Sequence, residues 1–585
     1  MIYEFNKETT LAQNVLNVLA EEGIKENAKN IFGVKIVPTK GDYKAFLSDV
    51  IKDDHPTLFV GVEDYDGDGV CSAKIIDMRN QKMGLNVIDV NAGKLEKALT
   101  NDEKKENLIN ELVEKFHRYS NLHFSTGLLP NRYTDHYGLG MSIMKKINII
   151  VEAFKKAFGD NVEIFIETAD NGIRSNEAIA YANSLGYRVM VTDHHQAVGD
   201  LPDAEVIVNP HTCPQPNLGT EDICGATVCA LIAADFLQMP IAKCFEYAAV
   251  ATITDVMPLV KENLFLVRWF LDRANKGKIG DLQLEVLLNA TGASLTAVTA
   301  DDIGFGVGPL VNACGRLETA DIAFNFFKER DSRGRYDALA KIFNLNEKRK
   351  VLSFEYTTKA MQGNINSNMI VSSVDGCPEG ILGIVSAHVT EKTNRPSGIL
   401  AKAEDGTYTG SFRSIEGFNL LENATKVFNA HPEIVVRYGG HAGAMGATLK
   451  DLNSLDVFRE EMSKLFKPDE LNLQEKSYIK YDDDYTLGEL YEEFYKYQPF
   501  GEGRAKPIFI TKKVLYGIQD IKSMHESWAS YFGGKRVTCY NFNCTPNLDR
   551  EGQEHTFTFS IHKSVKIVKN QLKVTYEPYV EEILD

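Results

Sequence analysis

Short apolar runs alternate with amphipathic stretches of helical period between residue 57 and about residue 260. Between two of these runs, SNEAIAYANSLG predicts a helix that Ser175 caps and Gly186 ends. Strands that alternate with helices in this way are typical of a parallel sheet covered by helices. The runs predicted to contain its strands are TLFVGVED (57–64), VEIFIETADNG (162–172), YRVMVTDHH (187–195) and AEVIVNP (204–210).

The pattern changes along the rest of the chain. Mostly helical sequence, including DALAKIFNLNEKRK, gives way near MIVSSVDGCPEGILGIVSAHV to a second α/β pattern, and HTFTFSIH and LKVTYEPYV then alternate as β-strands do. The 585 residues exceed what one hydrophobic core serves. We therefore expect a multidomain α/β protein with five segments: an N-terminal segment (1–50), a domain with a mainly parallel sheet (51–265), a helical linker (266–360), a second α/β domain (361–465) and a β-rich domain (466–585).

Composition places the chain among soluble globular proteins, since 44% of its residues are hydrophobic and 25% are charged. No apolar stretch approaches the roughly 20 residues that span a bilayer, and MIYEFNKETT does not resemble a signal peptide. We expect a cytoplasmic protein without a membrane partner. Nine cysteines without CxxC pairs predict reduced thiols. The net charge of −17 does not exclude nucleic acid, because a basic groove can lie on an acidic body.

Four polar clusters carry the candidate chemistry: EDYDGDGVCS (63–72), TADNGI (168–173), VTDHHQ (191–196) and ATITDVMPL (251–259). Three of them follow predicted strands, where open α/β sheets bind ligands. Oxygen and imidazole ligands without cysteine suit Mn²⁺ or Mg²⁺, and histidine favours manganese. Two divalent cations would relieve the repulsion among the carboxylates and support phosphate ester hydrolysis. The candidate ligands are Asp64, Asp66, Asp68, Asp170, Asp193, His194, His195 and Asp255.

Each cluster also has a simpler interpretation. DYDGDG resembles part of a calcium loop, although Ile75 stands where an EF-hand needs glutamate. Asp170 before Asn171 and Gly172 is compatible with a turn, Asp255 with a helix cap, and the histidine pair with a polar turn. It is improbable that four unrelated turns, caps or loops of this kind occur in one chain by chance. Their joint occurrence therefore favours a single metal site.

DYDGDGVCS, ADNGI, VTDHHQ and TITDVMPL resemble, in this order, the four motifs of the DHH phosphoesterase superfamily, most closely its RecJ branch of single-strand-specific DNA exonucleases. LLPNRYTDHYGLG and VGPLVNACGRLETA are similar to further RecJ segments. EGILGIVSAHVTEKTNRP, GSFRSIEGFNL and YGGHAGAMGATL resemble the DHHA1 domain, and YQPFGEGRAKPIF resembles the start of the RecJ oligonucleotide-binding (OB) domain. The resemblance implies a DHH domain at 51–265, a DHHA1 domain at 361–465 and an OB-like domain at 466–585.

The resemblance also implies residue roles. Asp66, Asp68, Asp170, His194 and Asp255 would bind metal, with Asp170 as a bridge and Asp64 beside them, and His195, Asp170 and Asp193 would serve catalysis. Arginine forks suit phosphate capture, and the candidates for gripping the 5′ phosphate or nearby backbone are Arg132, Arg316, Ser411 and Arg413, whose alternative role is salt bridging. Close approach of a strand is expected at Gly439, Gly440 and His441. Candidates for stacking on bases, or alternatively for the barrel core, are Trp528, Tyr531, Phe532, Tyr540 and Phe542.

The resemblance thus implies a two-metal 5′-to-3′ exonuclease of single-stranded DNA that releases 5′-mononucleotides. The alternative within the superfamily is a phosphodiesterase of short oligoribonucleotides or cyclic dinucleotides, and a catalytically silent scaffold is disfavoured because all four clusters keep their ligands. The sequence contains no GxxxxGK[ST] loop, so a helicase or single-strand-binding partner would be needed on duplexes. We expect a monomer, and repair, recombination and replication are all compatible roles.

Overall fold

A computed structural model describes most of the chain: residues 2–52, 55–239, 241–293, 296–363, 367–403, 405–467, 477–521, 525–542, 544, 546–568 and 571–584. It forms two compact units. The first comprises Met1–Leu129, Gly138–Gly308 and Glu475–Asp585, and the second comprises Pro130–Tyr137 and Pro309–Gln474. The five expected segments therefore remain a proposal, because the first unit joins three of them by contact. Within the described residues, no helix has the length and apolar composition needed to cross a bilayer.

The first unit is built on a six-stranded sheet in which every neighbouring pair is parallel. All four strand-bearing runs expected from the sequence form strands, and β2 is buried along its whole length because helices cover both faces. The pattern did not predict the short strands β3 and β4. The order across the sheet is β3 (Asn86–Val87), β4 (His123–Leu128), β2 (Thr57–Glu63), β5 (Glu163–Ala169), β6 (Arg188–Thr192) and β7 (Val206–Val208).

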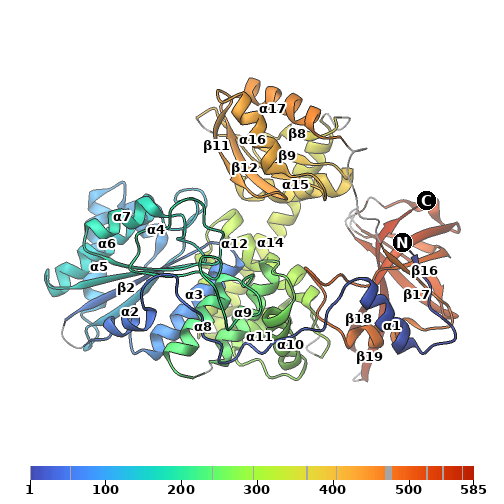
Figure 1. The fold of residues 1–585 in the computed structure, drawn as a ribbon, viewed down its shortest axis with the longest axis horizontal. Helices are drawn as coiled ribbons and strands as arrows, with labels where there is room; N and C mark the ends of the chain where they lie inside the picture. Colours follow the sequence, from blue (N-terminus) through green and yellow to red (C-terminus); the bar gives the residue numbers. More distant parts are fainter. Residues whose placement is uncertain are drawn as a thin grey trace. The chain divides into compact units, whose positions relative to one another are not determined.

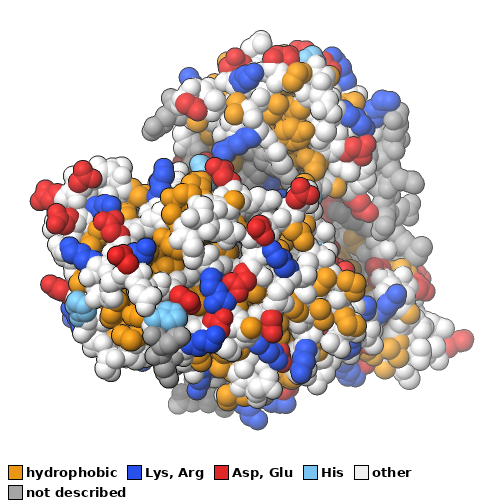
Figure 2. Space-filling view, turned by 60° about the vertical axis from the view of Figure 1, so that its left-hand side comes forward, with side chains coloured by type: hydrophobic (Ala, Val, Ile, Leu, Met, Phe, Trp, Pro, Cys, Tyr) orange, Lys and Arg blue, Asp and Glu red, His pale blue; other side chains and the backbone are white. Residues whose placement is uncertain are grey.

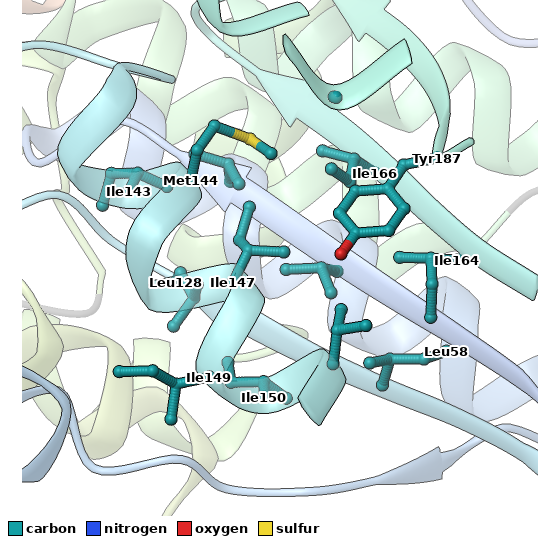
Figure 3. Close-up of a cluster of buried hydrophobic side chains, with 14 of the residues drawn as sticks. Leu58, Leu128, Ile143, Met144, Ile147, Ile149, Ile150, Ile164, Ile166 and Tyr187 are labelled. Carbon is teal, nitrogen blue, oxygen red and sulfur yellow. The ribbon is translucent and has the colours of Figure 1, made fainter. Parts of the chain in front are cut away.

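Helices lie on both faces of this sheet (Figure 1). One face carries α4 (Ala92–Ala98), α5 (Asp102–Phe116), α6 (Met141–Phe158) and α7 (Asn176–Ser184). Figure 3 shows Ile143, Ile147 and Ile150 of α6 gathered over Leu58 and Ile164 of the strands, all of them almost completely buried. The opposite side carries α2 (Tyr43–Asp49), α3 (Gly67–Lys82), α8 (Gly225–Phe236) and α9 (Ala242–Thr254), and the chain continues into α10 (Lys261–Asn275), α11 (Leu282–Ala290) and the π-helical turn η1 (Asp302–Val307).

The C-terminal part of the first unit is a closed β-barrel. Only Leu515 separates β14 (Phe509–Val514) from β15 (Tyr516–Ile521), so the two form one bent strand. Its β14 half pairs with β18 (Glu554–Val568), and its β15 half pairs with β16 (His525–Phe532). β17 (Lys535–Phe542) pairs with β16 and, in parallel, with β19 (Gln571–Ile583), which pairs with β18. This connectivity is that of a five-stranded OB barrel.

The barrel core corrects two of the stacking candidates. Trp528 and Phe532 are buried with Phe557 and Phe559 against helix α18 (Leu487–Tyr495), so they pack in the interior and are not available to bases. Strand alternation explains this, because residues of even number in β16 point inward. Tyr540 and Phe542 lie on the outer face instead.

The N-terminal residues connect the barrel to the parallel sheet. β1 (Ile2–Tyr3) pairs with β13 (Tyr478–Lys480), and α1 (Leu11–Glu21) packs into the barrel core. Further on, the Glu26 carboxylate accepts hydrogen bonds from Arg268 and Arg504. The backbone of Lys40 pairs with Ile207 of β7. Residues 2–50 are therefore an integral part of the first unit, which the sequence pattern did not predict.

The second unit contains a five-stranded mixed sheet in the order β11 (Val435–Gly440), β12 (Ala444–Leu449), β10 (Tyr408–Arg413), β9 (Ser397–Lys402) and β8 (Ile370–Ser373). One face packs on α16 (Leu420–Ala430) and α17 (Leu452–Leu465), and the other packs on α14 (Ser332–Met361) and α15 (Glu379–Thr393). The helices α12 (Gly308–Leu317) and α13 (Asp321–Lys328) precede α14. Met445 of the segment YGGHAGAMGATL is buried in the core of this unit.

Acidic and basic side chains are interspersed on the face of the molecule that Figure 2 presents. The chain has more acidic than basic residues and a net charge of −17. On that face, however, the acidic residues do not form a patch separate from the basic ones. On this face, attraction of a polyanion would therefore depend on particular sites and not on a uniform field.

Candidate metal centre

The four polar clusters meet at one edge of the parallel sheet. β2 ends just before Asp64, β5 ends just before Asp170, and β6 ends just before Asp193. Parallel strands present their carboxyl ends at the same edge, which explains why segments more than 100 residues apart converge. Asp255 joins them as the residue that directly follows α9.

The ligand atoms form three overlapping groups, in each of which all atoms lie within 4.8 Å of one another. Nε2 of His194 lies 3.1 Å from Oδ1 of Asp170, and 3.6 Å from Oδ2 of both Asp68 and Asp255. Asp170 and His194 each belong to two of the groups, so these two residues link the cluster. The groups are Asp170, His194 and His195; Asp68, His194 and Asp255; and Asp64, Asp66 and Asp170.

The first motif does not form the calcium loop that its sequence resembles. Asp66 is the N-cap of α3, and its Oδ1 accepts hydrogen bonds from the backbone N–H groups of Asp68 (3.0 Å) and Gly69 (3.1 Å). A side chain at Gly69 would collide with the Asp64 carbonyl, since a Cβ would lie 2.2 Å from that oxygen. The glycines therefore serve a tight strand-to-helix turn that presents the carboxylates at the sheet edge.

Asp68 is held by backbone donors that the sequence analysis missed. Its carboxylate accepts hydrogen bonds from the N–H groups of Gly225 (2.7 Å) and Ala226 (2.8 Å), at the N-terminus of α8. Only glycine fits at position 225, because a Cβ would lie 2.8 Å from the Cβ of Asp170. The one available signal was the glycine that opens the apolar segment ICGATVCAL.

Asp193 positions the histidine loop. Its Oδ1 accepts hydrogen bonds from the backbone of His194 (2.7 Å) and from Nδ1 of His195 (2.8 Å), and its Oδ2 accepts one from the Ile173 N–H (2.9 Å). Burial opposes ionisation of Asp193, yet the hydrogen bond from His195 holds the pKa of this carboxyl below its usual range. Because Nδ1 of His195 is bonded to Asp193, this carboxylate fixes the orientation of the imidazole ring.

Asn171 is a second residue that the sequence analysis missed as part of the site. It is buried, and its amide donates to the carbonyls of Val62 (2.9 Å) and Ala169 (2.8 Å) and accepts from the Leu139 N–H (3.1 Å). It therefore ties together the ends of β2 and β5 and the segment before α6. This tie fixes the neighbouring Asp170, whose φ of 61° lies in the left-handed region.

The electrostatics of the cluster call for cations. Burial, reinforced by neighbouring carboxylates, raises the pKa of Asp68 to about 6 and of Asp255 to about 9, and raises the pKa of Asp170 well above its usual value. Burial lowers the pKa of His194 to about 3, so this imidazole is neutral. In the part of the chain that the structure describes, Nε2 of His194 and Oδ2 of Asp255 are buried and form no hydrogen bond of ordinary geometry. Neutral imidazole and crowded carboxylate oxygens fit divalent cations.

The metal-free protein is expected to lose stability between about pH 4 and about pH 9. An unfolded aspartate titrates near a pKa of about 3.9, whereas folding raises the pKa of Asp68 to about 6 and of Asp255 to about 9. Such groups contribute stability below the unfolded pKa, and this contribution is lost as the pH rises through the folded pKa. Thermal unfolding in EDTA across this range measures the loss.

Manganese should raise the unfolding midpoint more at about pH 8.5 than at about pH 5.5, because its ligands must be deprotonated. Asp160→Asn is the matched control, because Asp160 is exposed and lies just before the start of β5, whereas Asp170 follows the end of this strand. This variant should keep the wild-type dependence on metal and pH. An equal manganese effect at both pH values would contradict the coupling.

In the second unit, three of the four phosphate candidates lie around the start of α15. Arg316 donates to the Gly380 carbonyl (3.1 Å), and Arg413 donates to the Ser411 hydroxyl (3.0 Å). A Cβ on Gly383 would lie 2.8 Å from Nη2 of Arg413, so the guanidinium rests on the helix. Burial lowers the pKa of Arg413, and no carboxylate within the described residues forms an ion pair with it. The fourth candidate, Arg132, precedes Tyr133, whose hydroxyl donates to the Arg316 carbonyl.

The glycines of the GGH motif have a structural role. Gly440 has a φ of 150°, and a Cβ there would lie 2.4 Å from the Ala444 carbonyl across the hairpin of β11 and β12. Gly439 has open space around its Cα, and His441 is exposed, with Nδ1 accepting from the Gly443 N–H (3.3 Å). Gly440 is thus required by the turn, while contact of Gly439 and His441 with a strand stays a prediction.

Comparisons with known proteins agree with this architecture. The family model "DHH family, N-terminal domain" matches residues 58–252 and the model "DHHA1 domain" matches residues 366–468, together about half of the chain. Single-stranded-DNA-specific exonuclease RecJ of Salmonella typhimurium is 29% identical over 364 residues, covering 58% of this chain and 60% of that protein. RecJ of Bacillus subtilis is 29% identical over 418 residues, covering 67% and 52%. The chain thus spans little more than half the length of these relatives.

A solved structure shows the same fold at low identity. The crystal structure of RecJ in complex with Mn²⁺ from Thermus thermophilus matches with a TM-score of 0.71 at 20% identity, over 99% of this chain and 76% of that one. The ordered motifs, the domain matches and this fold agree with one another. The chain therefore belongs to the DHH family, as a RecJ-like member that carries both a DHH and a DHHA1 domain.

Proposed function

We propose that the protein is a two-metal 5′-to-3′ exonuclease that hydrolyses single-stranded DNA and releases 5′-mononucleotides. The observation that supports this most is the convergence of buried carboxylates and a neutral imidazole at one sheet edge. The relatives are single-stranded-DNA-specific exonucleases by name, and the chain spans only part of each.

Two cations fit the donor set, with Asp64, Asp66, Asp68, His194 and Asp255 as ligands around a shared Asp170. When bound, two such cations lower the pKa of a water and stabilise both oxygens of an in-line phosphoryl displacement. We favour manganese over magnesium because one of the ligands is a nitrogen.

The chain itself supplies orientation and charge at the reacting phosphate. The Asp193 carboxylate holds His195 in one orientation, and despite burial this partner raises the pKa of His195. The imidazole is about two-fifths exposed, so it can reach a phosphate oxygen and donate to it through Nε2. His195 is therefore proposed to stabilise the charge that develops on the scissile phosphate.

The second unit is proposed to hold the 5′ end. Arg413 is half-buried beside the Ser411 hydroxyl, and a partly desolvated cation that pairs with no carboxylate among the described residues suits a phosphate. Arg316 and Arg132 belong to the same unit and extend the proposed phosphate grip. On duplexes, a helicase or single-strand-binding protein would supply the unpaired strand. We also propose that the protein is monomeric and cytoplasmic.

Labelled single strands test the function. With Mn²⁺, a strand labelled at its 5′ end should release labelled mononucleotide at once, whereas a strand labelled at its 3′ end should shorten progressively, and EDTA should stop both reactions. Matching duplexes should resist. Release from the 3′ end would overturn the proposed polarity, and activity confined to dinucleotides would favour the oligoribonucleotide or cyclic dinucleotide alternative.

Arg413→Gln should raise KM for 5′-phosphorylated strands about tenfold or more, because a charge-assisted contact to a phosphate is lost. For strands with a 5′ hydroxyl the same variant should change KM little. Arg459→Gln is the matched control, since Arg459 lies in the same unit and pairs with Asp456 on α17. Equal losses on both kinds of strand would contradict the proposed contact.

A further inference from the structure

Val256 has a backbone conformation that its side chain disfavours, directly beside a candidate metal ligand. It follows Asp255 in the chain, and its φ of 56° lies in the left-handed region. Branching at Cβ makes this region costly, so a valine there is an outlier. Among the described residues, Val256 is the only β-branched residue that has a positive φ. The other non-glycine residues with a positive φ are His136, Asp170, Gln238, Lys261 and Asn394.

The end of α9 explains this conformation but does not explain the choice of valine. The N–H of Val256 donates to the Ile253 carbonyl (3.2 Å), and the N–H of Met257 donates to the Thr252 carbonyl (3.0 Å). These two bonds form the Schellman motif that ends many helices, in which glycine or asparagine usually takes the left-handed position. Because strained residues cluster at active sites, a valine at this position points to a role for its side chain.

Packing in the core does not account for the valine either. The Val256 side chain is 62% exposed, so most of its apolar surface remains available to a substrate. The segment that follows is held in place, because the Leu259 N–H donates to the Glu502 carbonyl (2.8 Å) at the entry of the barrel. The turn therefore presents Val256 from a fixed backbone.

A second exposed apolar side chain belongs to a turn that packs on the same end of α9. Phe305 is 82% exposed on the π-helical turn η1, and such turns are rare and frequent at functional sites. A Cβ on Gly304 would lie 3.5 Å from Cγ2 of Ile253, and one on Gly308 would lie 2.9 Å from Cγ2 of Thr254. The end of α9 beside the metal centre thus carries apolar surface from two segments.

The position of Val256 decides which part of a nucleotide it can meet. Neighbouring Cα atoms lie about 3.8 Å apart, so the side chain starts close to the ligand Asp255. A scissile phosphate is bonded to O3′ of the terminal nucleotide, and C2′ is the next carbon of that sugar. In DNA this carbon is apolar, whereas in RNA it carries the hydroxyl by which proteins distinguish the two. Valine has no hydrogen-bonding group, so covering a 2′-hydroxyl would leave that hydroxyl unsatisfied.

We propose that Val256 covers C2′ of the terminal deoxyribose and thereby sets a preference for DNA over RNA. The proposal rests on the proposed function for the place of the scissile phosphate. It adds a residue that determines specificity and that is not a metal ligand. The valine is kept at a position where asparagine or glycine would be less strained, because only an apolar side chain disfavours ribose there.

Val256→Thr provides the sharpest test, because threonine keeps the branched shape and adds one hydroxyl that can pair with the 2′-hydroxyl. Wild type with Mn²⁺ should cleave an all-DNA strand about tenfold faster than a strand whose only ribonucleotide is at the 5′ end, since a hydroxyl is left unsatisfied. Val256→Thr should reduce this preference about fivefold, because the threonine hydroxyl supplies the missing partner. Its rate on the all-DNA strand should stay within about twofold of wild type, because the shape of the side chain is conserved.

Val256→Asn separates specificity from strain. Asparagine tolerates the left-handed region, so this variant should unfold about 2 °C above wild type in EDTA while it loses the preference for DNA. Gln238→Asn is the matched control, because Gln238 is exposed and follows the C-cap of α8 with a φ of 52°. This control should keep the wild-type preference.

Equilibrium binding of mononucleotides gives a readout without cleavage. In Mn²⁺, wild type should bind 2′-deoxyuridine 5′-monophosphate about tenfold more tightly than uridine 5′-monophosphate, and Val256→Thr should narrow this difference. A wild type without preference, or a Val256→Thr variant with the wild-type preference, would overturn the proposal. If no strand is cleaved but the two nucleotides are distinguished in this way, the proposed function fails and the role of Val256 stands. If strands are cleaved with the same preference by both proteins, only the role of Val256 fails.

Discussion

Asp170→Asn is expected to lower manganese-dependent nuclease activity by more than about 100-fold, because loss of a residue that merely orients a metal ligand already costs about 10–100-fold. Asp170 belongs both to the ligand group with Asp64 and Asp66 and to the ligand group with His194 and His195. Its φ of 61° is in the left-handed region, which asparagine tolerates and alanine does not. The asparagine variant therefore removes the charge and keeps the backbone. Initial rates on a single strand, compared with wild type, measure the effect.

The same variant should be more stable than wild type when metal is absent. Burial and four neighbouring carboxylates raise the pKa of Asp170, so ionising it costs folding free energy that an asparagine does not lose. In EDTA at about pH 8, Asp170→Asn should unfold at a higher temperature than wild type, and manganese should no longer raise its midpoint. The control Asp160→Asn should match wild type in both tests. A variant that is less stable in EDTA, or that retains activity, would remove Asp170 from the centre.

The parallel sheet of the first unit was predictable because its strands are buried on both faces. β2 and β5 are continuous apolar runs followed at once by carboxylates, so both the strand and its functional end are visible in the sequence. β4 was missed because HFSTGL mixes small polar residues with apolar ones. The path of residues 2–50 was missed for another reason: β1 pairs with a strand more than 470 residues away, and no local pattern encodes that contact.

The convergence of the candidate metal ligands could be predicted from their residue types and positions, but the groups that hold them in place could not. The parallel sheet makes the convergence of Asp66, Asp170 and His194 a consequence of topology. The N–H groups of Gly225 and Ala226, which hold Asp68, are backbone atoms and leave no residue-type signal. Asn171 is part of ADNGI, yet its bonds to two strand ends depend on how those strands stack side by side.

The barrel aromatics show where sequence reasoning ends. Trp528, Phe532, Tyr540 and Phe542 all belong to strands, and composition alone treats them alike. The register between β16 and β17 places the first two inside and the last two outside. Tyr579 of β19 contacts Phe542 and was not among the sequence candidates, because this contact depends on pairing between β17 and β19.

Arg504→Met is expected to destabilise the first unit by about 1–3 kcal/mol, because buried hydrogen-bonding groups lose their donor. Arg504 is 1% exposed. Its guanidinium donates to the Lys25 carbonyl (2.7 Å), to the Glu26 carboxylate (2.6 Å) and to the Tyr497 carbonyl (2.5 Å). These bonds join the N-terminal residues to the segment that enters the barrel. Methionine fills similar volume but removes the donor of the Tyr497 carbonyl and one of the two arginines that contact Glu26, the other being Arg268.

Urea unfolding and limited proteolysis measure this effect. Lys480→Met is the matched control, because Lys480 also pairs with an N-terminal residue, Glu4, but on the surface, where an ion pair contributes about 1 kcal/mol or less. Arg504→Met should shift the urea midpoint well below that of the control and expose the chain near residue 25 to protease. If the two variants unfolded alike, the N-terminal residues would be a passive attachment. The expected difference instead makes Arg504 the residue through which the barrel, the N-terminal residues and the catalytic sheet fold as one unit.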